Sequence, residues 1–421
     1  MTGNSNTRTT LEAIAIFTNG GAWNQTEYSD EGVPVVRVTD IKDATVDLSN
    51  CRFLPRSSLS KYNKHVLRTG DLVICTVGSH PTQPGSIVGR AAVMPDAAHG
   101  ALLNQNAVCI RASSSEIDQR WLGYLGRSRG FHDYIISCAR GSANQVRMAI
   151  GLLKEMPVEI PPLSMQSRIA DILSAYDELI ENSQRRIKIL EEMARNLYRE
   201  WFVQFRFPGH EKLPRVALPL GEIPNGWKMK KVGEICAYLN RGISPSYDEE
   251  GNSTVINQKC IRDQRLALEP ARRQSKSIPP EKLVCFGDVL INSTGIGTLG
   301  RVAQAYEGLG QCTVDTHVTI ARAAADIDVD YFGCTLLAFQ DEFERLGVGA
   351  TGQTELSRTA ISNIEIRIPP SNIQRRFGQL VRPSRLATIV LSNQIQNLRQ
   401  TRDLLLPRLL TGQLVNIQAD A

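Results

Sequence analysis

The chain has 421 residues, of which 42% are apolar and 22% charged, as in a soluble globular protein of two to four domains. No apolar run approaches the roughly 20 residues of a membrane span, and the polar start MTGNSNTRTT lacks the apolar core of a signal peptide, so we expect a cytoplasmic protein. The formal net charge of +5 permits a polyanionic partner without requiring one.

The first globular half mixes strands and helices. Alternating apolar runs beside turn signals predict strands, and in RTGDLVICTVGS a Gly-Asp turn leads into a buried strand. The pair Gly89-Arg90 precedes another strand. The expected elements are strands within 32–41, 68–79 and 106–111 and helices within 117–138.

A long helix is expected next. From Pro161 the sequence PPLSMQSRIADILSAYDELIENSQRRIKILEEMARNLYREWFV places apolar residues at alternating spacings of four and three, which keeps one narrow apolar seam on a helix. No helix breaker occurs before Pro208, so the helix can extend over about 40 residues, or roughly 60 Å. The prolines and glycines of 206–227 then predict a linker.

The second half of the chain repeats the first. Residues 369–411 align without a gap with residues 161–203 at an offset of 208 (369 − 161 = 208), and a second helical pattern covers 330–346. Loops have changed length while the helices have not, so a globular half and a helix are used twice. The offset falls along the chain, from 220 at Ile41/Ile261 to 217 at Gly70/Gly287 and 211 at Gly89/Gly300.

This repeat predicts an α+β fold with two similar mixed α/β domains, separated by two long antiparallel helices and related by a pseudo-twofold axis. The expected boundaries are a first domain at 1–162, a central helix at 163–207, a second domain at 208–370 and a C-terminal helix at 371–421. The helices would pair as a coiled-coil spacer. The alternative is that each is an ordinary amphipathic helix packed on its own domain. The expected seam consists of Ile187, Leu190, Leu197, Leu391, Ile395, Leu398 and Leu405.

One proline departs from this pattern. Pro383 lies near the start of the second helix and removes a backbone donor. We expect a short helix, a break, and then the long helix.

Motifs for catalysis and metal binding are largely missing. The six residues from Gly295 to Gly300 satisfy GxGxxG, but this fingerprint needs a following helix, and the RVAQAY that follows reads as a strand. No GxxxxGK[ST] phosphate loop occurs, and the histidines do not cluster. The nine cysteines are scattered, odd in number and without a CxxC pair, so we expect buried thiols and neither disulfides nor zinc.

Polar loops suit nucleic-acid recognition better. Side chains of Asn, Gln, Ser and Arg can bond base edges, and Lys and Arg can bind phosphates. For any one of these residues, the alternative is an ordinary surface-loop position. The candidate DNA-binding residues are Trp23, Asn24, Gln25, Ser79, His80, Thr82, Gln83, Arg140, Ser142, Asn144, Gln145 and Arg147 in the first half and Arg241, Ser244, Tyr247, Ser293, Thr294, Thr351, Gln353 and Thr354 in the second.

Over nearly its whole length the chain resembles the specificity subunit of a type I restriction-modification enzyme. The resemblance is most specific in PPLSMQSRIADIL at 161–173, its echo PPSNIQRRFGQL at 369–380, the C-terminal LRQTRDLLLPRLLTGQL, and the GDLVI and GDVLI strands.

The resemblance implies a non-catalytic subunit whose two domains recognise the two halves of a split double-stranded DNA target. The paired helices would set the gap between the halves and help to dock methyltransferase subunits, which a translocating restriction subunit can join. S-adenosylmethionine, ATP and Mg²⁺ are then expected only on those partner subunits. Unequal loops in the two halves predict an asymmetric target. Two alternatives remain: the recognition subunit of a modification-only DNA methyltransferase, and a protein scaffold without a DNA role.

Overall fold

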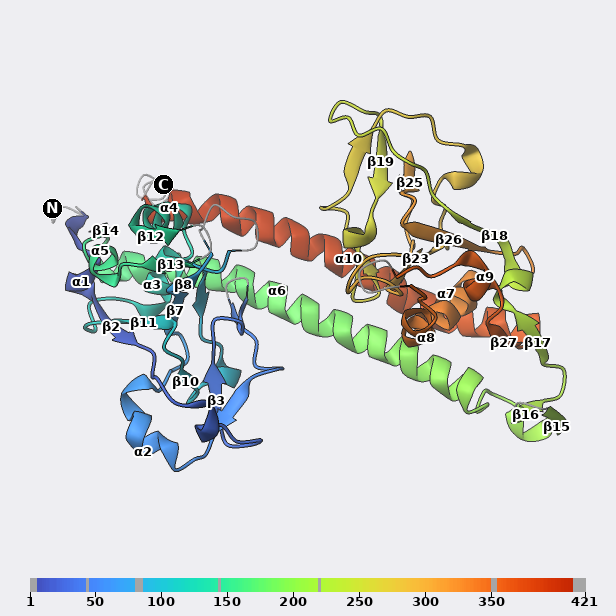
Figure 1. Ribbon diagram of the computed structural model, residues 1–421, viewed down its shortest axis with the longest axis horizontal. Coiled ribbons are helices and arrows are strands. Elements are labelled where there is room, and N and C mark those ends of the chain that lie inside the picture. The colour runs from blue at the N-terminus through green and yellow to red at the C-terminus, as the bar shows by residue number, and fades with distance from the viewer. Residues whose placement is uncertain are drawn as a thin grey trace. The chain divides into compact units, whose positions relative to one another are not determined.

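The computed structural model describes residues 6–42, 45–79, 86–142, 145–218, 221–349 and 354–411. The chain divides into two compact units. Unit 1 consists of Met1–Glu181 and Gln396–Ala421, and unit 2 is the continuous segment Asn182–Ile395. Two long helices, α6 (Leu163–Tyr198) and α10 (Ser371–Leu410), each contribute one part to either unit (Figure 1). Each unit is therefore a globular domain with a segment of both long helices.

The domain of unit 1 is organised by an antiparallel four-stranded sheet with the order β2, β11, β7, β9. A three-stranded sheet has the order β10, β3, β6, with β10 parallel to β3, a second has the order β12, β13, β8, and the pairs β1–β14 and β4–β5 complete the domain. The strands are β1 (Thr7–Thr10), β2 (Ala15–Asn19), β3 (Val33–Val36), β4 (Ile41–Lys42), β5 (Thr45–Val46), β6 (Arg52–Leu54), β7 (Leu72–Cys75), β8 (Val77–Gly78), β9 (Ala91–Val93), β10 (Leu102–Leu103), β11 (Ala107–Ala112), β12 (Ala139–Ser142), β13 (Gln145–Met148) and β14 (Pro157–Ile160).

Unit 2 repeats this strand order. Its four-stranded sheet runs β18, β26, β23, β24, and its three-stranded sheet runs β25, β19, β22, with β25 parallel to β19. The duplication inferred from the sequence is thus confirmed in the topology. The strands are β15 (Arg215–Leu218), β16 (Gly221–Pro224), β17 (Lys228–Lys231), β18 (Cys236–Arg241), β19 (Ser253–Ile256), β20 (Ile261–Arg262), β21 (Arg265–Leu266), β22 (Arg272–Gln274), β23 (Val289–Asn292), β24 (Val302–Gln304), β25 (Cys312–Val314), β26 (Val318–Ala323) and β27 (Glu365–Ile368).

The helical patterns predicted in the two domains are confirmed, and each is divided in two. Unit 1 has α3 (Gln119–Gly126) and α4 (Arg129–Cys138), and unit 2 has α7 (Val329–Ala338) and α8 (Gln340–Arg345). Among the helices of the described ranges, none is both long and apolar enough to cross a membrane. The shorter helices are α1 (Leu11–Ile14), α2 (Ser58–Tyr62), α5 (Ile150–Lys154) and α9 (Arg358–Ser362).

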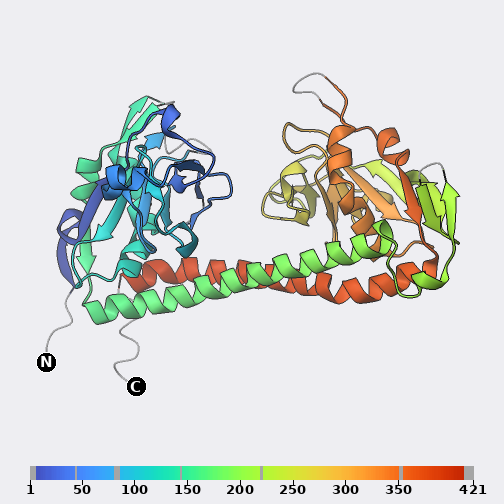
Figure 2. The same ribbon diagram turned by 90° about the horizontal axis from the view of Figure 1, so that it is seen from below.

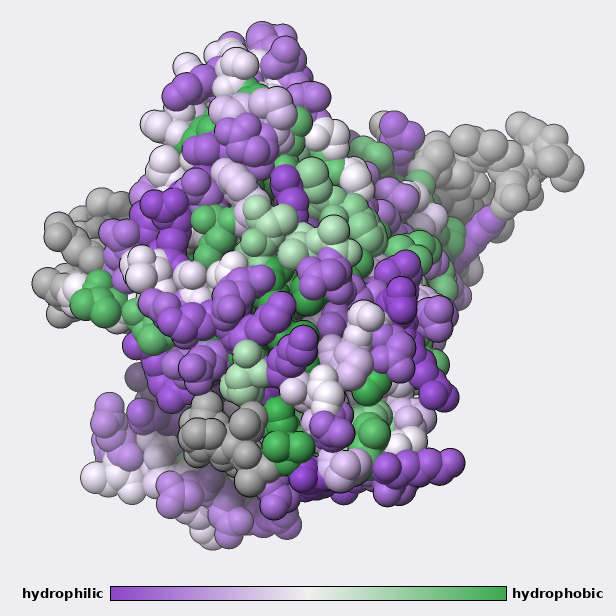
Figure 3. Space-filling model, turned by 90° about the vertical axis from the view of Figure 1, so that its right-hand side faces the viewer, coloured by the Kyte–Doolittle hydropathy of each residue, from purple (hydrophilic) through white to green (hydrophobic). Residues whose placement is uncertain are grey.

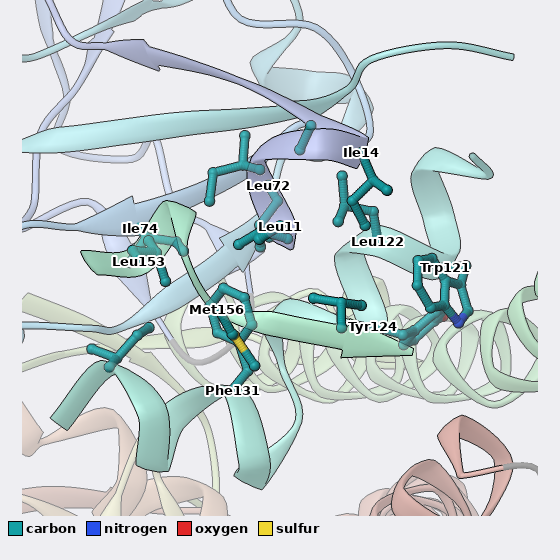
Figure 4. Packing of buried hydrophobic residues seen from close by; sticks show 14 of the residues in the cluster. Leu11, Ile14, Leu72, Ile74, Trp121, Leu122, Tyr124, Phe131, Leu153 and Met156 are labelled. Carbon is teal, nitrogen blue, oxygen red and sulfur yellow. The ribbon is translucent and has the colours of Figure 1, made fainter. Parts of the chain in front are cut away.

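The core of unit 1 lies between its four-stranded sheet and its helices. Leu72 and Ile74 of β7 pack with Trp121 of α3 and Phe131 of α4 (Figure 4). Both long helices join the same cluster. They contribute Ile169, Ala170 and Leu173 from α6 and Leu406 and Leu409 from α10. Burial of these side chains, worth about 1.5–3 kcal/mol for each large one, fixes the helix segments to the domain.

Unit 2 has an aromatic core at the corresponding junction. Phe202, which follows α6 in the π-helical turn Arg199–Val203, lies 4.8 Å from the Phe377 ring of α10 and 4.8 Å from the Tyr331 ring of α7. The expected linker at 206–227 is not an open connection, because Phe207 and Trp227 are buried in this cluster. The segment folds back onto its own domain.

The two helix segments within each unit run antiparallel. In unit 1, Asp177 of α6 pairs with Arg402 of α10 at 2.5 Å, and in unit 2 the Tyr198 ring lies 6.3 Å from Phe377. In each unit the segments lie side by side under the domain (Figure 2). Of the expected seam residues, Ile187, Leu391 and Ile395 are buried, and Leu190, Leu197, Leu398 and Leu405 are half-buried.

The prediction of a break at Pro383 is wrong, since α10 continues through it. A proline inside a helix costs about 3 kcal/mol through its missing hydrogen bond and ring clash. The neighbouring residues offset this cost. Phe377 and Val381 are buried in the core of unit 2, and Arg382 pairs at 2.8 Å with the fully buried Asp330.

Six of the nine cysteines are buried, as the sequence predicted. Buried thiols behave as small apolar side chains. The buried residues are Cys75, Cys109, Cys138, Cys260, Cys312 and Cys334.

A duplicated amide fixes the start of each long helix. Gln166 accepts a hydrogen bond from the backbone of Asp118 at 2.8 Å and donates to the Pro161 carbonyl at 2.9 Å. Gln374 makes the same two bonds, at 3.0 and 2.8 Å, with Asp328 and Pro369. Both amides are buried. Asp118 caps the N-terminus of α3, and Asp328 caps the N-terminus of α7. The match of these two glutamines in the sequence therefore reflects a structural joint.

A duplicated ion pair fixes the central strand of each domain. Asp71, in the Gly-Asp turn before β7, pairs with Arg111 at 2.5 Å, and Asp288, before β23, pairs with Arg322 at 2.7 Å. Each carboxylate also accepts the backbone N–H three residues earlier, which closes the turn. The glycine before each aspartate has a positive φ, so the turn needs glycine there.

Candidate nucleic-acid interface

The structure gives no support for a nucleotide or metal centre in the part of the chain that it describes. The GxGxxG loop leads into strand β24, so the helix that would meet a pyrophosphate is missing. No group of three or more His, Cys, Asp or Glu side chains that could hold a metal ion occurs among the described residues. On the end of unit 2 shown in Figure 3, hydrophilic residues predominate and hydrophobic ones form smaller areas between them.

The first candidate loop of unit 1 joins β2 to β3. Asn24 and Gln25 are exposed there, whereas Trp23 is half-buried and packs edge-on against Tyr62, with 5.2 Å between the ring centres. The loop is fixed by Glu27, whose carboxylate accepts bonds from the Asn24 backbone, Lys61 and Tyr62. These donors lower the pKa of Glu27 to about 2. The loop is thus preorganised, with a lysine at its side.

A half-buried tyrosine of the same loop, Tyr28, packs with an exposed arginine. The guanidinium carbon of Arg52, on edge strand β6, lies 5.0 Å from the centre of the Tyr28 ring. An arginine stacked on a ring keeps its N–H edge free for a phosphate or a guanine. Its conformation is already restricted, so less entropy is lost on binding.

Unit 2 has the same pair in the loop that joins β18 to β19. Arg272, on edge strand β22, stacks over Tyr247 with 3.6 Å from its guanidinium carbon to the ring centre. The Tyr247 side chain is 43% exposed, and Ser244 in the same loop is also exposed. Tyr247 was expected from the sequence, whereas Arg272 was not.

Strand register shows that the two arginines are equivalent. Arg52 lies opposite Val35 in unit 1, and Arg272 lies opposite Val255 in unit 2. Both steps, from Val35 to Val255 and from Arg52 to Arg272, equal 220, the offset of the repeat at this point. The repeat therefore preserves an exposed arginine on one edge strand of both domains, and a tyrosine lies beside it in each.

A second group of candidates in unit 1 lies around β8, β12 and β13. Arg147 is exposed on β13 and lies opposite Arg140 of β12 and opposite Val77 of β8, two residues before Ser79. The structure thus brings Ser79 and Arg147 to one small sheet. Ser142 and Gln145 lie opposite each other in the same strand pair. His80, Thr82, Gln83 and Asn144 lie outside the described residues.

The remaining candidates of unit 2 have mixed positions. Arg241 pairs with Glu355 at 2.7 Å, and the Thr294 hydroxyl contacts His317 at 2.8 Å. Thr354 is half-buried, and Thr351 and Gln353 lie outside the described residues. The expectation of a surface contact needs correction for Ser293, which is fully buried because its hydroxyl bonds Thr319 at 2.6 Å inside the sheet.

Two segments of the chain match a known protein family. The profile of the type I restriction modification DNA specificity domain matches residues 9–192 and again 224–398. The chain belongs to this family. The two matches cover the two domains with their strand repeat, so the family resemblance seen in the sequence is confirmed.

Relatives within the specificity family span most of the chain. The type I restriction enzyme MjaIX specificity subunit of Methanocaldococcus jannaschii is 28% identical over 304 residues, which cover 70% of this chain and 68% of that protein. The type I restriction enzyme HindI specificity subunit of Haemophilus influenzae is 22% identical over 438 residues, covering 87% and 90%. The solved structure of a type I system S subunit from M. genitalium has a TM-score of 0.60 at 17% identity and covers 97% of both chains, which shows the shared fold.

Tyr28, Arg52 and Arg272 are not among the DNA-binding candidates predicted from the sequence. The signal that could have found them is the repeat itself. At the offset of 220 that holds in this part of the repeat, Arg52 matches Arg272. The partner tyrosines are 219 residues apart, so the alignment slips by one residue just before the strand.

Proposed function

We propose that the chain is the DNA-specificity subunit of a type I restriction-modification complex, in which each unit recognises one half of a bipartite, asymmetric duplex target. The observation that carries this proposal is an exposed arginine that recurs at one register position in both domains and stacks on a tyrosine in each. Recurrence indicates a contact that both halves need, such as a phosphate or a guanine. Surrounding loops that differ in length and sequence then give each half its own target.

The complex would divide its chemistry among subunits. This chain acts as a non-catalytic reader, and the two long helices set the gap between half-sites and contribute to docking of methyltransferase subunits, which a restriction subunit can join. S-adenosylmethionine, ATP and Mg²⁺ bind to those partner subunits. The family membership and the duplicated joints at Gln166 and Gln374 support this division, because a rigid connection between reader and helix is what a spacer requires.

The test uses the chain co-expressed with its neighbouring methyltransferase. Methylated adenines are mapped by single-molecule sequencing to define the target, and duplex affinity is then measured for Arg52→Met and Arg272→Met. Loss of one such contact should weaken binding by about 1–3 kcal/mol, or roughly five-fold to more than a hundred-fold. Arg56→Met and Arg345→Met each remove an exposed charge from the same unit and serve as matched controls.

Base changes in the target assign each arginine to a half-site. A mismatch in the half read by unit 1 should add little to the loss in Arg52→Met, whereas a mismatch in the other half should add fully, because only groups in contact couple. Arg272→Met should show the reverse pattern. Additive losses with both halves would assign the arginines to phosphates, whose contacts do not depend on the base sequence, and coupling of both variants to the same half would contradict the proposal.

A further inference from the structure

The junction between α3 and the long helices in unit 1 is closed by four polar side chains. The carboxylate of Asp177 accepts hydrogen bonds from the Tyr124 hydroxyl at 2.8 Å, from Arg127 at 2.9 Å and from Arg402 at 2.5 Å. The tyrosine and both arginines are largely buried. A single carboxylate of α6 thus pairs with two arginines, one at the C-terminal end of α3 and one on α10.

The repeat assigns a counterpart to each of these residues in unit 2. Asp118 and Asp328 are equivalent helix caps, so each residue of α3 matches the residue of α7 that lies 210 positions later in the sequence. Residues of the two long helices match at a separation of 208. Not one of the four polar groups is kept, and the carboxylate is replaced by an arginine. The counterparts of Tyr124, Arg127, Asp177 and Arg402 are Cys334, Leu337, Arg385 and Ala194.

All four counterparts line a pocket of about 610 Å³ that lies wholly within unit 2. Its lining is largely apolar and aromatic, with Tyr198 from α6, Tyr306 after β24 and Ile389 from α10. Polar and charged side chains, among them Gln264, Gln304 and Arg385, complete the lining. The place that side chains occupy in unit 1 is therefore open in unit 2, and its size and lining are those of small-molecule sites.

Arg385 of α10 lines this pocket. Its Nη1 atom lies 3.6 Å from the Cys334 sulfur, and its guanidinium carbon lies 4.6 Å from the centre of the Tyr306 ring. The nearby carboxylate of Asp330 is already engaged by Tyr306 and Arg382. A thiol and a ring face satisfy little of a guanidinium that has five N–H donors. Arg385 thus has no carboxylate partner among the described residues.

We propose that this pocket binds a small organic anion with an apolar body and a planar carboxylate head that pairs with Arg385. The guanidinium fork matches a carboxylate in a bidentate way, so the ligand would supply the group that Asp177 supplies in unit 1. The lining carries four arginines against three acidic residues, and the Arg265–Glu191 pair is neutral, which leaves a surplus of positive charge. A ligand here touches α6, α7 and α10 together and so fixes the second domain to its helix segments.

The test measures binding of 2-naphthoate and of its neutral isostere 2-naphthamide to the full chain by titration calorimetry. We expect one naphthoate per chain and an affinity at least ten-fold higher than that of naphthamide. Arg385→Met should bring the two affinities to within about two-fold of each other, because the apolar walls remain. Arg399→Met removes an exposed arginine of α10 that does not line the pocket, and should leave the preference unchanged.

A second variant closes the pocket by rebuilding the arrangement of unit 1. Ala194→Arg combined with Arg385→Asp places the arginine and the carboxylate at the positions of Arg402 and Asp177, so naphthoate binding should be lost while the thermal midpoint stays equal or rises. No binding of naphthoate to the unaltered chain, equal binding of the amide, or full naphthoate binding by the double variant would each overturn the proposal. The comparison of acid and amide on the unaltered chain decides the matter even if a variant fails to fold.

Discussion

Unit 1 and unit 2 share their strand order and their buried joints, but differ in the contacts that their helices make with the domain surface. The amide joints at Gln166 and Gln374 and the ion pairs of Asp71 and Asp288 agree partner for partner. A few residues away, the polar cluster around Asp177 has no counterpart in unit 2. The comparison teaches that the repeat conserves the contacts that set backbone geometry, while contacts between side chains alone have diverged.

The largest effect is expected at the buried carboxylates of the Gly-Asp turns. Asp288→Ala leaves Arg322 without its partner and the turn without its closing bond, and loss of one member of a buried pair costs on the order of 3–5 kcal/mol. Asp71→Ala should cost a similar amount, but in unit 1. Hydrogen exchange of β23 and β7 peptides, read by mass spectrometry, shows which unit loosens.

The exposed Asp326→Asn and Asp96→Asn substitutions control for the charge change in each unit. They should alter stability by less than about 0.5 kcal/mol. If Asp288→Ala loosened both units equally, the ion pair would not belong to one compact unit and the comparison would fail.

The next effect concerns the helix joints. Gln374→Leu leaves a buried N–H of Asp328 and a buried carbonyl of Pro369 without partners, at a cost of about 1–3 kcal/mol for each unsatisfied group. Gln166→Leu should cost at least as much, since it breaks the equivalent two bonds and a third, longer one to the Glu116 carbonyl at 3.2 Å. Urea denaturation of both variants measures the loss, with the exposed Gln400→Leu as the control. A clearly smaller loss in Gln166→Leu would show that only the Gln374 joint supports its helix.

Much of this fold follows from the sequence because the determining signals are local. The glycine before Asp71 and the one before Asp288 mark turns with positive φ, and alternating apolar residues mark strands, so the repeated α+β domains were predictable. Helix spacing gave α6 and α10 for the same reason. Pro383 was misjudged because its local penalty is offset by burial of Phe377 and by the Arg382–Asp330 pair, which no local pattern reveals.

The candidate interface was less predictable because exposure depends on strand pairing. Ser293 and Thr294 are neighbours in a polar run, yet Ser293 bonds inside the sheet while Thr294 is partly exposed at its end. Likewise, the stacking of Arg272 on Tyr247 joins two loop ends that are 25 residues apart, and only the register of β22 against β19 brings them together. A sequence shows which residues can bond a base, but pairing decides which of them reach the surface.

The smallest effect follows from pH at the Asp177 cluster of unit 1. Burial opposes ionisation of Asp177, but the hydrogen bonds and charges of Arg127 and Arg402 prevail and lower its pKa. A carboxylate with a lowered folded pKa adds stability above its unfolded pKa, near 3.9, and that stability is lost as pH falls through the folded pKa. Arg402→Met should therefore reduce the protection of α6 residues 170–181 at pH 7, by about 1 kcal/mol, and the difference from the unaltered chain should shrink toward pH 3.

Residues 183–198 of α6 supply the comparison, because their unit has Arg385 at the matched position and no such carboxylate. Their protection should be the same in Arg402→Met and in the unaltered chain at both pH values. Arg399→Met, an exposed change three residues away, should leave both segments unchanged. A difference between Arg402→Met and the unaltered chain that persisted undiminished at pH 3 would mean that Arg402 acts through its aliphatic packing. The contrast between the two junctions would then be one of shape rather than of charge.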